Sequence, residues 1–523
     1  RVRTFSAALC AAGIEPGDRV AIWAPNDPRW IVAALGIFSS GATLVPVNTR
    51  FKGAEARDVV DRGAAKLLVT VTESVAGDLL AELRSAGWVP GAAHHVVVMR
   101  GEVPPGATGW DGFCDGVGES DLAVADARRA GVTSDDVSDI LFTSGTTGAP
   151  KGVVQTHGRT MRVASDWVAM VDLAEGERYL MVNPYFHMFG LKAGILASVC
   201  AGATMYPVAV FDADTVLRRV SGEAITVLPG APTLYQSLLE HPGRGAHDLS
   251  SLRVAVTGAA DIPVELIRRV SEELPFERII TGYGLTEAGT ATATDPGDDP
   301  ETVAATVGRP RPGFEVRIDS GGDGAADESV DAGGPTGIGK TDAGQTDVGQ
   351  TDVGPTDVGR TDVGEVGEIL LRGPSVMSHY LDDPQATAEA LGDDGWLRTG
   401  DLGVIDAAGC VRILGRSKDM FIVGGFNAYP AEIENMLLEH PAITQVAVIG
   451  IPDERLGEVG MAFVVATGSS PGVVDEAALI EWSRGRMANY KAPRRIEFVD
   501  ELPVNATGKV LKEDLRARFA AGS

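Results

Sequence analysis

The stretch that decides the fold runs from Asp139 to His157 and reads DILFTSGTTGAPKGVVQTH. Its first apolar residues, 140–142, are typical of the end of a buried strand. Residues 143–151 include no bulky apolar side chain, and the apolar run resumes at Val153. In such a loop, glycines let backbone N–H groups approach an anion, hydroxyls donate hydrogen bonds and Lys151 adds positive charge. The stretch therefore predicts a strand followed by a loop that binds the phosphates of a nucleotide.

This loop departs from the common phosphate-binding pattern G-x-x-x-x-G-K-[ST], because Pro150 precedes Lys151 and Gly152 follows it. A flexible surface hairpin is the alternative interpretation, since glycine, serine and threonine are ordinary turn residues. The order [ST]-S-G-[ST]-T-G-x-P-K-G resembles the signature of the adenylate-forming enzymes, which include acyl-CoA synthetases, luciferases and the adenylation domains of peptide synthetases. The resemblance implies that the nucleotide-binding residues of the loop are Thr143, Ser144, Gly145, Thr146, Thr147, Gly148 and Lys151.

Length and charge narrow the classes of protein. A chain of 523 residues is too long for one hydrophobic core, so at least two domains are expected. The net charge of −27 argues against nucleic acid or an anionic membrane as a partner. No apolar run reaches the length of a membrane span, and no secretory signal opens the chain, which predicts a cytoplasmic protein. Because the chain begins at Arg1 rather than methionine, we expect further residues before it.

Strand and helix patterns alternate up to about residue 260, which predicts α/β layers with parallel sheets. The family resemblance implies a large N-terminal AMP-binding domain of layered α/β subdomains over residues 1–415. It also implies a small, mobile C-terminal α/β domain over residues 416–523, in which Lys418 is the hinge. The four cysteines lie far apart and show no metal spacing, so we expect reduced thiols.

A segment from about residue 320 to 365 breaks the globular pattern. It is rich in glycine and aspartate, and residues 341–365 repeat a five-residue unit such as TDVGQ. This composition buries too little apolar area to offset the entropy of ordering, so a disordered insertion is predicted between two strands, 315–318 and 368–372, that pair as a hairpin. Within it, GPTGIGKT at 334–341 matches the common phosphate loop, but lacks the preceding strand and following helix that the motif needs.

Further stretches carry the family resemblance in the same order along the chain. The first is PYFH at 184–187, for which the resemblance places His187 at the carboxylate pocket; a packed core histidine is the alternative. The second is Gly258, Ala259 and Ala260, which follow the strand-like run RVAVT. Their small side chains leave room for a flat ring, which the resemblance identifies as adenine, although such a turn could end any strand.

The heptad TGYGLTE at residues 281–287 is a more specific signal. The resemblance implies that Tyr283 and Gly284 contact adenine and that Thr286 offers its hydroxyl to the α-phosphate. Glu287 offers a carboxylate, which is a ligand that Mg²⁺ prefers, whereas a solvated carboxylate at a helix start is the alternative. His187, Thr286 and Glu287 are therefore predicted to take part in catalysis, with Glu287 as the metal ligand.

The C-terminal third supplies the remaining predicted residues. Asp401 ends the run WLRTGD, and the resemblance assigns it to the ribose. The resemblance also implies that Arg416 reaches the ribose or the phosphates. Gly424 and Gly425 could line a narrow tunnel for the pantetheine arm of coenzyme A, with a plain hairpin turn as the alternative. Lys509 lies in PVNATGK, and the resemblance implies that it contacts the substrate carboxylate and the α-phosphate; a placed ammonium lowers the barrier where negative charge develops.

Together these motifs predict an AMP-forming acid–thiol ligase that uses ATP, Mg²⁺ and coenzyme A to convert a carboxylic acid into acyl-AMP and then acyl-CoA. A ligase that loads a carrier protein, one that stops at the adenylate, and an inactive scaffold are the alternatives. The runs at 183–197, 226–239 and 424–434 resemble actinobacterial acyl-CoA synthetases, some of which activate a propanoate left by steroid degradation or another fatty acid. A monomer or homodimer is expected. The predicted acyl-pocket residues are Trp167, His187, Lys192, Gly230, Ala231, Pro232, Gly258, Gly282 and Gly289.

Overall fold

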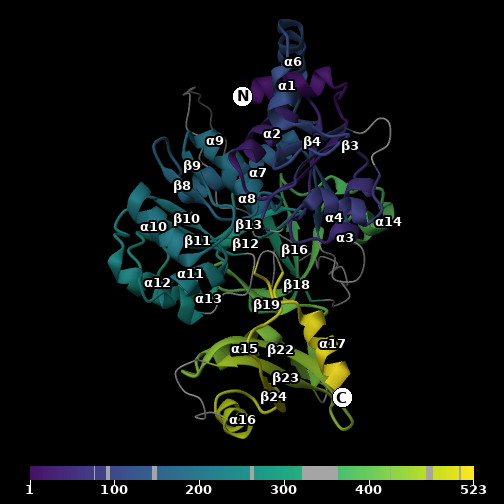
Figure 1. Ribbon diagram of the computed structural model, residues 1–523. Coiled ribbons are helices and arrows are strands. Elements are labelled where there is room, and N and C mark those ends of the chain that lie inside the picture. Colours follow the sequence, from purple (N-terminus) through teal and green to yellow (C-terminus); the bar gives the residue numbers. More distant parts are fainter. Residues whose placement is uncertain are drawn as a thin grey trace, which may run out of the picture.

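The structure is a computed structural model that describes residues 1–75, 77–89, 95–143, 150–258, 264–320, 363–423, 426–466, 475–505 and 508–522. Nearly all of the predicted insertion, including the phosphate-loop match at 334–341, lies outside the described residues. Helices and layered sheets alternate through the larger upper part of the molecule, and a smaller part lies below it (Figure 1). Within the described ranges, no helix has both the length and the apolarity to cross a membrane.

The first sheet has eight strands in the order β17-β7-β6-β2-β1-β3-β4-β5. Its central pairs β2–β6, β1–β2, β1–β3 and β3–β4 are parallel, as the alternating strand and helix patterns predict. Strands β6 and β7 form an antiparallel hairpin on either side of the glycine-rich loop, and β17 pairs with β7. The strands are β1 (Arg19–Trp23), β2 (Thr43–Pro46), β3 (Ala65–Val71), β4 (His95–Arg100), β5 (Thr108–Gly109), β6 (Val137–Thr143), β7 (Lys151–Thr156) and β17 (His379–Tyr380).

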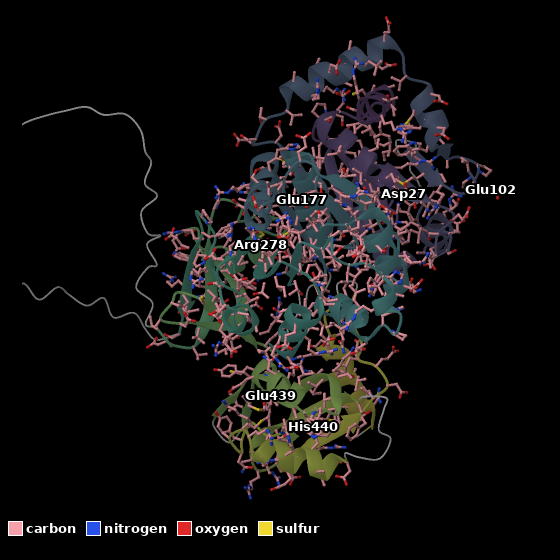
Figure 2. All side chains as sticks on the ribbon, turned by 90° about the vertical axis from the view of Figure 1, so that its left-hand side faces the viewer. Asp27, Glu102, Glu177, Arg278, Glu439 and His440 are labelled. Carbon is pink, nitrogen blue, oxygen red and sulfur yellow. The ribbon has the colours of Figure 1, made fainter. Side chains whose placement is uncertain are left out.

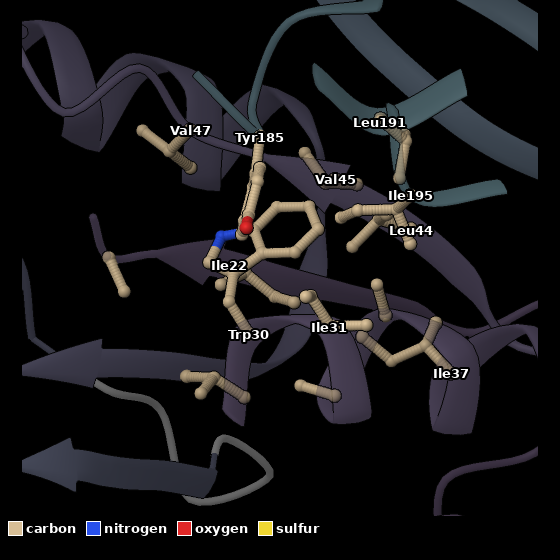
Figure 3. Close-up of a cluster of buried hydrophobic side chains, with 14 of the residues drawn as sticks. Ile22, Trp30, Ile31, Ile37, Leu44, Val45, Val47, Tyr185, Leu191 and Ile195 are labelled. Carbon is tan, nitrogen blue, oxygen red and sulfur yellow. The ribbon is translucent and has the colours of Figure 1, made fainter. Parts of the chain in front are cut away.

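Helices cover this sheet because its strands are apolar on both faces and must be buried on both. Helix α2 (Pro28–Ser39) starts sharply, since Asp27 accepts a hydrogen bond from the Arg29 amide and Pro28 suits the first helical position. Its Trp30 packs edge-on against Tyr185, with ring centroids 5.3 Å apart, in the core shown in Figure 3. The other helices here are α1 (Val2–Ala11), α3 (Gly53–Arg62), α4 (Leu79–Ser85), α5 (Trp110–Asp115) and α6 (Glu119–Gly131).

A seven-stranded sheet, ordered β14-β13-β12-β11-β10-β8-β9, forms the second layer. Parallel strands β8, β10, β11 and β12 end on the side where the candidate site lies. Its strands are β8 (Arg178–Met181), β9 (Thr204–Pro207), β10 (Val227–Pro229), β11 (Val254–Thr257), β12 (Arg278–Leu285), β13 (Gly289–Ala293) and β14 (Arg309–Pro310). The associated helices are α7 (His157–Val171), α8 (Met188–Gly190), a π-helix (Leu191–Leu196), α9 (Ala197–Ala201), α10 (Ala213–Glu223), α11 (Pro232–Glu240), a 3₁₀ turn (Arg244–Ala246), α12 (Val264–Glu273) and α13 (Pro300–Ala305).

A third, antiparallel sheet has the order β15-β16-β18-β19. Strands β15 (Glu315–Asp319) and β16 (Gly367–Arg372) pair from Glu315 opposite Arg372 to Asp319 opposite Glu368. The hairpin predicted on either side of the insertion is therefore confirmed. The remaining strands are β18 (Leu397–Ile405) and β19 (Val411–Arg416), and α14 (Pro384–Ala390) precedes them.

Residues from Phe421 to Leu515 build a hydrophobic cluster of their own, which forms the lower part of the molecule in Figure 1. Seen from the side, Glu439 and His440 lie in this lower part, while Glu177 and Arg278 lie in the upper part (Figure 2). Its sheet is ordered β21-β20-β23-β22, with β24 also on β23. The elements are β20 (Phe421–Val423), β21 (Phe426–Ala428), α15 (Pro430–Leu438), β22 (Ile443–Asp453), β23 (Gly457–Ala466), α16 (Glu476–Arg484), β24 (Arg495–Phe498) and α17 (Lys512–Gly522).

Candidate active site

A cavity of about 530 Å³ opens where the sheets of the upper part meet the C-terminal part. Residues from many separated stretches of sequence, between Thr143 and Lys512, border this cavity, so folding brings the separate motifs together. The sequence-predicted residues on its wall are Thr143, Lys151, Trp167, His187, Pro232, Gly258, Gly282, Tyr283, Gly284, Thr286, Glu287, Asp401, Arg416 and Lys509. The role that the sequence assigns to each of them stays a prediction.

Asp401 is held between two partners at one side of the cavity. Tyr283 donates its hydroxyl to Asp401 Oδ2 at 2.6 Å, and Arg416 Nε lies 2.9 Å from Asp401 Oδ1. The two charged residues face each other across β18 and β19 because they form one cross-strand pair. Burial, followed by the charge of Asp401, raises the pKa of Tyr283 well above its ordinary value, so the phenol stays protonated and donates. This arrangement presents a carboxylate of fixed orientation, which suits recognition of hydroxyl groups.

Glu287 lies beside a second tyrosine. Tyr380, from the short edge strand β17, donates its hydroxyl to Glu287 Oε1 at 2.9 Å. The ammonium of Lys151 lies over the Tyr380 ring, 5.0 Å from its centroid. Burial raises the pKa of Glu287, and the Tyr380 hydrogen bond opposes that shift. Tyr380 therefore connects the acidic residue of the heptad to the lysine that ends the phosphate loop.

The backbone around Glu287 is fixed from the neighbouring sheet. Gln155, buried on β7, donates its amide to the carbonyls of Ser375 at 3.3 Å and Thr286 at 3.5 Å. The Met377 amide donates to the Glu287 carbonyl at 2.6 Å. These contacts hold Thr286 and Glu287, which directly follow the end of β12, next to β7.

The donor set at Glu287 fits Mg²⁺ bound together with a nucleotide. In the described part of the chain, no group of three or more His, Cys, Asp or Glu side chains could hold a metal by itself. Mg²⁺ needs no such cage, because it binds through one or two carboxylates plus phosphate oxygens and water. A single partly buried carboxylate that shares the cavity wall with Lys151 matches that mode.

Two predicted glycines are required by close backbone packing. A Cβ at Gly258 would lie 2.8 Å from the carbonyl oxygen of Gly282, and one at Gly284 would lie 2.3 Å from that of Gly289. Any side chain would force these strands apart. The strand ends therefore stay thin, which leaves a flat wall on the cavity.

His187 presents a defined nitrogen to the cavity. It caps α8, and its Nδ1 accepts a hydrogen bond from the Phe189 amide at 3.2 Å. Burial lowers the pKa of His187 from its ordinary value of 6.5 to about 4, so the ring is neutral at pH 7. Because Nδ1 accepts, the single ring proton resides on Nε2. His187 therefore offers an N–H donor.

The wall near His187 is apolar and wide. Trp167 and Phe189 pack edge-on with ring centroids 5.2 Å apart, and further apolar lining comes from Met170, Met188, Val256 and Leu266. One polar group interrupts it: the Thr257 hydroxyl is buried and has no hydrogen-bond partner within the described ranges. An unsatisfied buried hydroxyl costs free energy, which a bound acceptor would recover.

Four residues predicted for the acyl pocket are not on the cavity wall: Lys192, Gly230, Ala231 and Gly289. Lys192 points into the core, is 1% exposed and pairs with Asp139 at 2.9 Å. Gly230 faces Leu234, whose Cδ1 would be 2.6 Å from an added Cβ. Gly289 has φ +79° and packs against Val163, so its smallness serves a turn and a contact with α7.

Lys509 reaches the cavity on a short loop that contacts both parts of the molecule. Asn505 organises the loop, since its side-chain Oδ1 accepts from the Lys509 amide at 2.9 Å and its own amide donates to the Lys509 carbonyl at 2.8 Å. Arg50 donates to the Asn505 carbonyl at 2.7 Å. Gly508, with φ +83°, comes close to Thr233 of α11, leaving only 3.2 Å between that hydroxyl and an added Cβ. The loop is therefore docked against the upper part.

Lys418, the predicted hinge, lies among the described residues. Lys418 lies in the turn after β19, and burial lowers its pKa. The predicted residues that lie outside the described ranges are Ser144, Gly145, Thr146, Thr147, Gly148, Ala259, Ala260, Gly424 and Gly425.

Sequence reasoning missed residues that hold the site from a distance. Asn26 is buried, donates its amide to the carbonyls of Met181 and Asn183, and accepts from the Tyr185 amide at 3.0 Å. It thereby fixes the segment that leads into His187. Its signal in the sequence was an asparagine in an apolar surrounding, WAPNDP, which reads equally well as a turn. Tyr380, in MSHYLDD, carried no local signal at all.

Comparisons with known proteins extend over nearly the whole chain. Residues 1–334 match the family model for AMP-binding enzymes, and residues 432–509 match the model for the AMP-binding enzyme C-terminal domain. The chain is 45% identical over 520 residues to 3-[(3aS,4S,7aS)-7a-methyl-1,5-dioxo-octahydro-1H-inden-4-yl]propanoyl:CoA ligase of Rhodococcus jostii RHA1, covering 99% of this chain and 92% of the relative. It is 48% identical over 514 residues to the protein of the same name from Mycobacterium tuberculosis H37Rv, covering 98% and 91%.

Among solved structures, the anthranilate CoA ligase AuaEII in complex with anthranoyl-AMP matches with a TM-score of 0.82 at 27% identity. The match covers 100% of this chain and 92% of that one. The two-part α/β architecture of an adenylate-forming enzyme is therefore the fold of this chain.

Proposed function

Since the chain belongs to the family of AMP-binding enzymes and is an ATP-dependent acyl-CoA synthetase, we propose that its carboxylic acid is a propanoate attached to a compact two-ring ketone. The observation that carries this proposal is the identity of 45% and 48%, over nearly the whole chain, to two ligases named for such an acid. The cavity of about 530 Å³ and its apolar lining around Trp167 and Phe189 support a bulky acyl group. The unpartnered hydroxyl of Thr257 supports an acyl group that carries a carbonyl acceptor.

The reaction has two steps in one cavity. The carboxylate of the acid attacks the α-phosphorus of ATP. The bond between that phosphorus and the bridging oxygen breaks, and pyrophosphate leaves with the oxygen. The thiol of coenzyme A then attacks the acyl carbonyl, loses its proton and displaces AMP. We propose that His187 donates its Nε2–H to the carboxylate and that Lys509 offsets the negative charge that develops on the α-phosphate.

We also propose that the nucleotide is held by Asp401 at its ribose and by Tyr283 at its base, with Arg416 beside them. Glu287 would hold Mg²⁺ together with phosphate oxygens, positioned by Tyr380. When bound, that ion would supply charge neutralisation on the phosphates.

A division of the chain at Arg416 completes the proposal. Residues 416–523 would rotate about Lys418 between the two steps, because the docked Lys509 loop serves only the first step and the thiol must reach the same carbonyl in the second. Such a rotation would also shield the acyl-adenylate from water.

The test is a panel of acids assayed for pyrophosphate and AMP release with and without coenzyme A. The panel contains the dioxo-octahydroindenyl propanoate, the same bicyclic propanoate lacking both ketones, ferulate, octanoate and palmitate. We expect the diketone acid to give the highest kcat/KM, with sustained AMP release only when coenzyme A is present. A higher kcat/KM for palmitate or ferulate would refute the proposed substrate. Sustained AMP release at the same rate with and without coenzyme A would refute coenzyme A as the acyl acceptor.

Thr257→Val tests the contribution of the carbonyl with a matched pair of substrates. The variant keeps the side-chain shape and removes the hydroxyl. Loss of one buried hydrogen bond should lower kcat/KM for the diketone acid about tenfold. The kcat/KM for the acid without ketones should be unchanged. An equal loss of kcat/KM for both acids would show that Thr257 does not form a hydrogen bond with a ketone of the substrate.

A further inference from the structure

The segment that follows His187 passes straight through the protein core. Helix α8 continues into the π-helix Leu191–Leu196, and every residue of that π-helix is buried. Leu191 and Ile195 lie among the buried side chains of the first sheet and α2, including Ile22 and Trp30 (Figure 3). Lys192 lies between them in sequence and is 1% exposed, so it is an ionisable residue buried in a largely apolar core.

The partner of Lys192 is on the strand that enters the phosphate loop. Lys192 Nζ lies 2.9 Å from Asp139 Oδ1, and Asp139 is 0% exposed. Asp139 belongs to β6, which ends at Thr143 on the cavity wall. The ion pair therefore ties the segment after His187 to β6, four residues before Thr143 on the cavity wall.

Asp139 is in turn held rigidly by two hydroxyls. Ser138 and Thr160 each place an oxygen 2.6 Å from Asp139 Oδ2, and the two hydroxyl oxygens are 3.0 Å apart. Thr160 belongs to α7, the helix that also carries Trp167 of the cavity wall. The network thus joins β6, α7 and the π-helix at a single carboxylate.

Stability alone does not account for this pair. Desolvation of two buried charges often cancels their attraction, so a well-packed apolar pair would stabilise the fold equally well or better. What an ion pair adds is a defined distance between two elements. A π-helical turn has a wider backbone than an α-helix and is frequently found at functional sites. Here it lies four residues beyond the histidine that faces the cavity.

We propose that the Asp139–Lys192 ion pair is a positioning device for adenylation. It sets the spacing between the carboxylate end of the acyl site, at His187 and Phe189, and Thr143 at the end of β6. The inference rests on the acyl-CoA synthetase reaction and on the proposed place of the carboxylate at His187. In adenylation, the acid and ATP are separate molecules, so the protein alone aligns the attacking oxygen with the α-phosphorus. In acyl-AMP, a covalent bond already fixes that spacing. The pair should therefore matter for the first step and not for the second.

The experiment compares both half-reactions in the double variant Asp139→Asn/Lys192→Met. This variant removes both charges, keeps similar volumes and lets residue 139 still accept hydrogen bonds from Ser138 and Thr160, so it avoids an unpaired buried charge. Adenylation is followed as pyrophosphate release, using whichever acid of the panel the wild-type enzyme converts fastest. Thioester formation is followed separately from isolated acyl-AMP and coenzyme A.

We expect kcat for adenylation to fall about a hundredfold, because misplacement of reacting groups by about 1 Å costs that much. The KM for ATP and the rate of thioester formation from acyl-AMP should stay within about threefold of the wild-type values. The melting temperature should stay close to that of the wild type. The matched control is Glu177→Gln/Arg253→Met, which neutralises another ion pair of the upper part, 2.6 Å in length and off the cavity wall. It should leave both half-reactions unchanged.

Two results would overturn the proposal. Wild-type adenylation in the double variant would show that the pair only supports the fold. An equal loss in both half-reactions would show a general structural defect rather than a positioning role. Failure of the diketone acid in the panel would refute only the proposed substrate, because the comparison uses the best acid found.

Discussion

At the scale of single residues, His187 shows how burial and one hydrogen bond define a chemical role. Its folded-state pKa of about 4 lies below the ordinary value of 6.5. Between these two pH values the unfolded chain binds a proton at this residue more readily than the folded protein does. Stability should therefore fall as the pH drops from 6.5 toward 4, and above 6.5 the residue contributes no pH dependence.

His187→Phe should remove that part of the acid sensitivity. Between pH 7.5 and pH 5, we expect the variant to lose about 2 kcal/mol less unfolding free energy than the wild type, as an order of magnitude. Thermal melting of both proteins across this pH range measures the difference. If the wild type and the variant lost the same unfolding free energy as the pH falls, His187 would not be held neutral by burial.

Tyr380 and Glu287 give the second prediction at this scale. Glu287→Gln should reduce adenylation strongly and raise the Mg²⁺ concentration needed for half-maximal rate, since the carboxylate is the proposed ligand. Tyr380→Phe removes only the 2.9 Å hydrogen bond to Glu287. It should raise the Mg²⁺ concentration needed for half-maximal rate about tenfold, a smaller change than in Glu287→Gln. Titration of activity with Mg²⁺ at saturating ATP tests both. An unchanged Mg²⁺ requirement in Glu287→Gln would refute the assignment.

At the scale of elements, the loop that carries Lys509 is a docked segment rather than a free tail. Arg50 and Thr233 of the upper part contact the backbone around Asn505 and Gly508. Docking places the ammonium for one step of the reaction. A charge that is needed in only one arrangement of the two parts contributes little to the barrier of the other.

Lys509→Ala should therefore nearly abolish acyl-AMP formation, by about 10²- to 10³-fold, while thioester formation from supplied acyl-AMP stays near wild type. Arg50→Ala should weaken adenylation in the same direction, because it frees the loop. Gly425→Leu, at a position predicted from the sequence to line the coenzyme A tunnel, should do the reverse. Equal loss of both half-reactions in all three variants would contradict a two-arrangement mechanism.

At the scale of the whole molecule, the insertion between β15 and β16 interrupts a hairpin that is otherwise complete. The two strands pair in register up to Asp319 opposite Glu368. Their pairing needs no long connection, and loop length changes closure entropy only slowly.

Deletion of residues 322–364 should leave adenylation and the melting temperature nearly unchanged. The deletion also removes the phosphate-loop match at 334–341, so it tests whether that match binds ATP. Turnover and nucleotide affinity of the shortened protein are the measurements. A loss of more than tenfold in either, with the protein still folded, would give the insertion a role in the reaction.

The sequence by itself determined the strand that enters the glycine-rich loop, the alternation of strands and helices up to about residue 260, and the hairpin on either side of the insertion. These features are local, because turn chemistry and hydrophobic period act over a few residues. The tertiary structure alone decided where Lys192 goes, since a segment buried on all sides has no period that marks one face. It also decided which distant residues meet, such as Tyr380 with Glu287 and Arg50 with Asn505. Contacts between residues 93 and 455 positions apart leave no trace in either local pattern, because only the folding of distant segments brings them together. The first joins partly buried side chains at the cavity, and the second is an exposed hydrogen bond between the two parts.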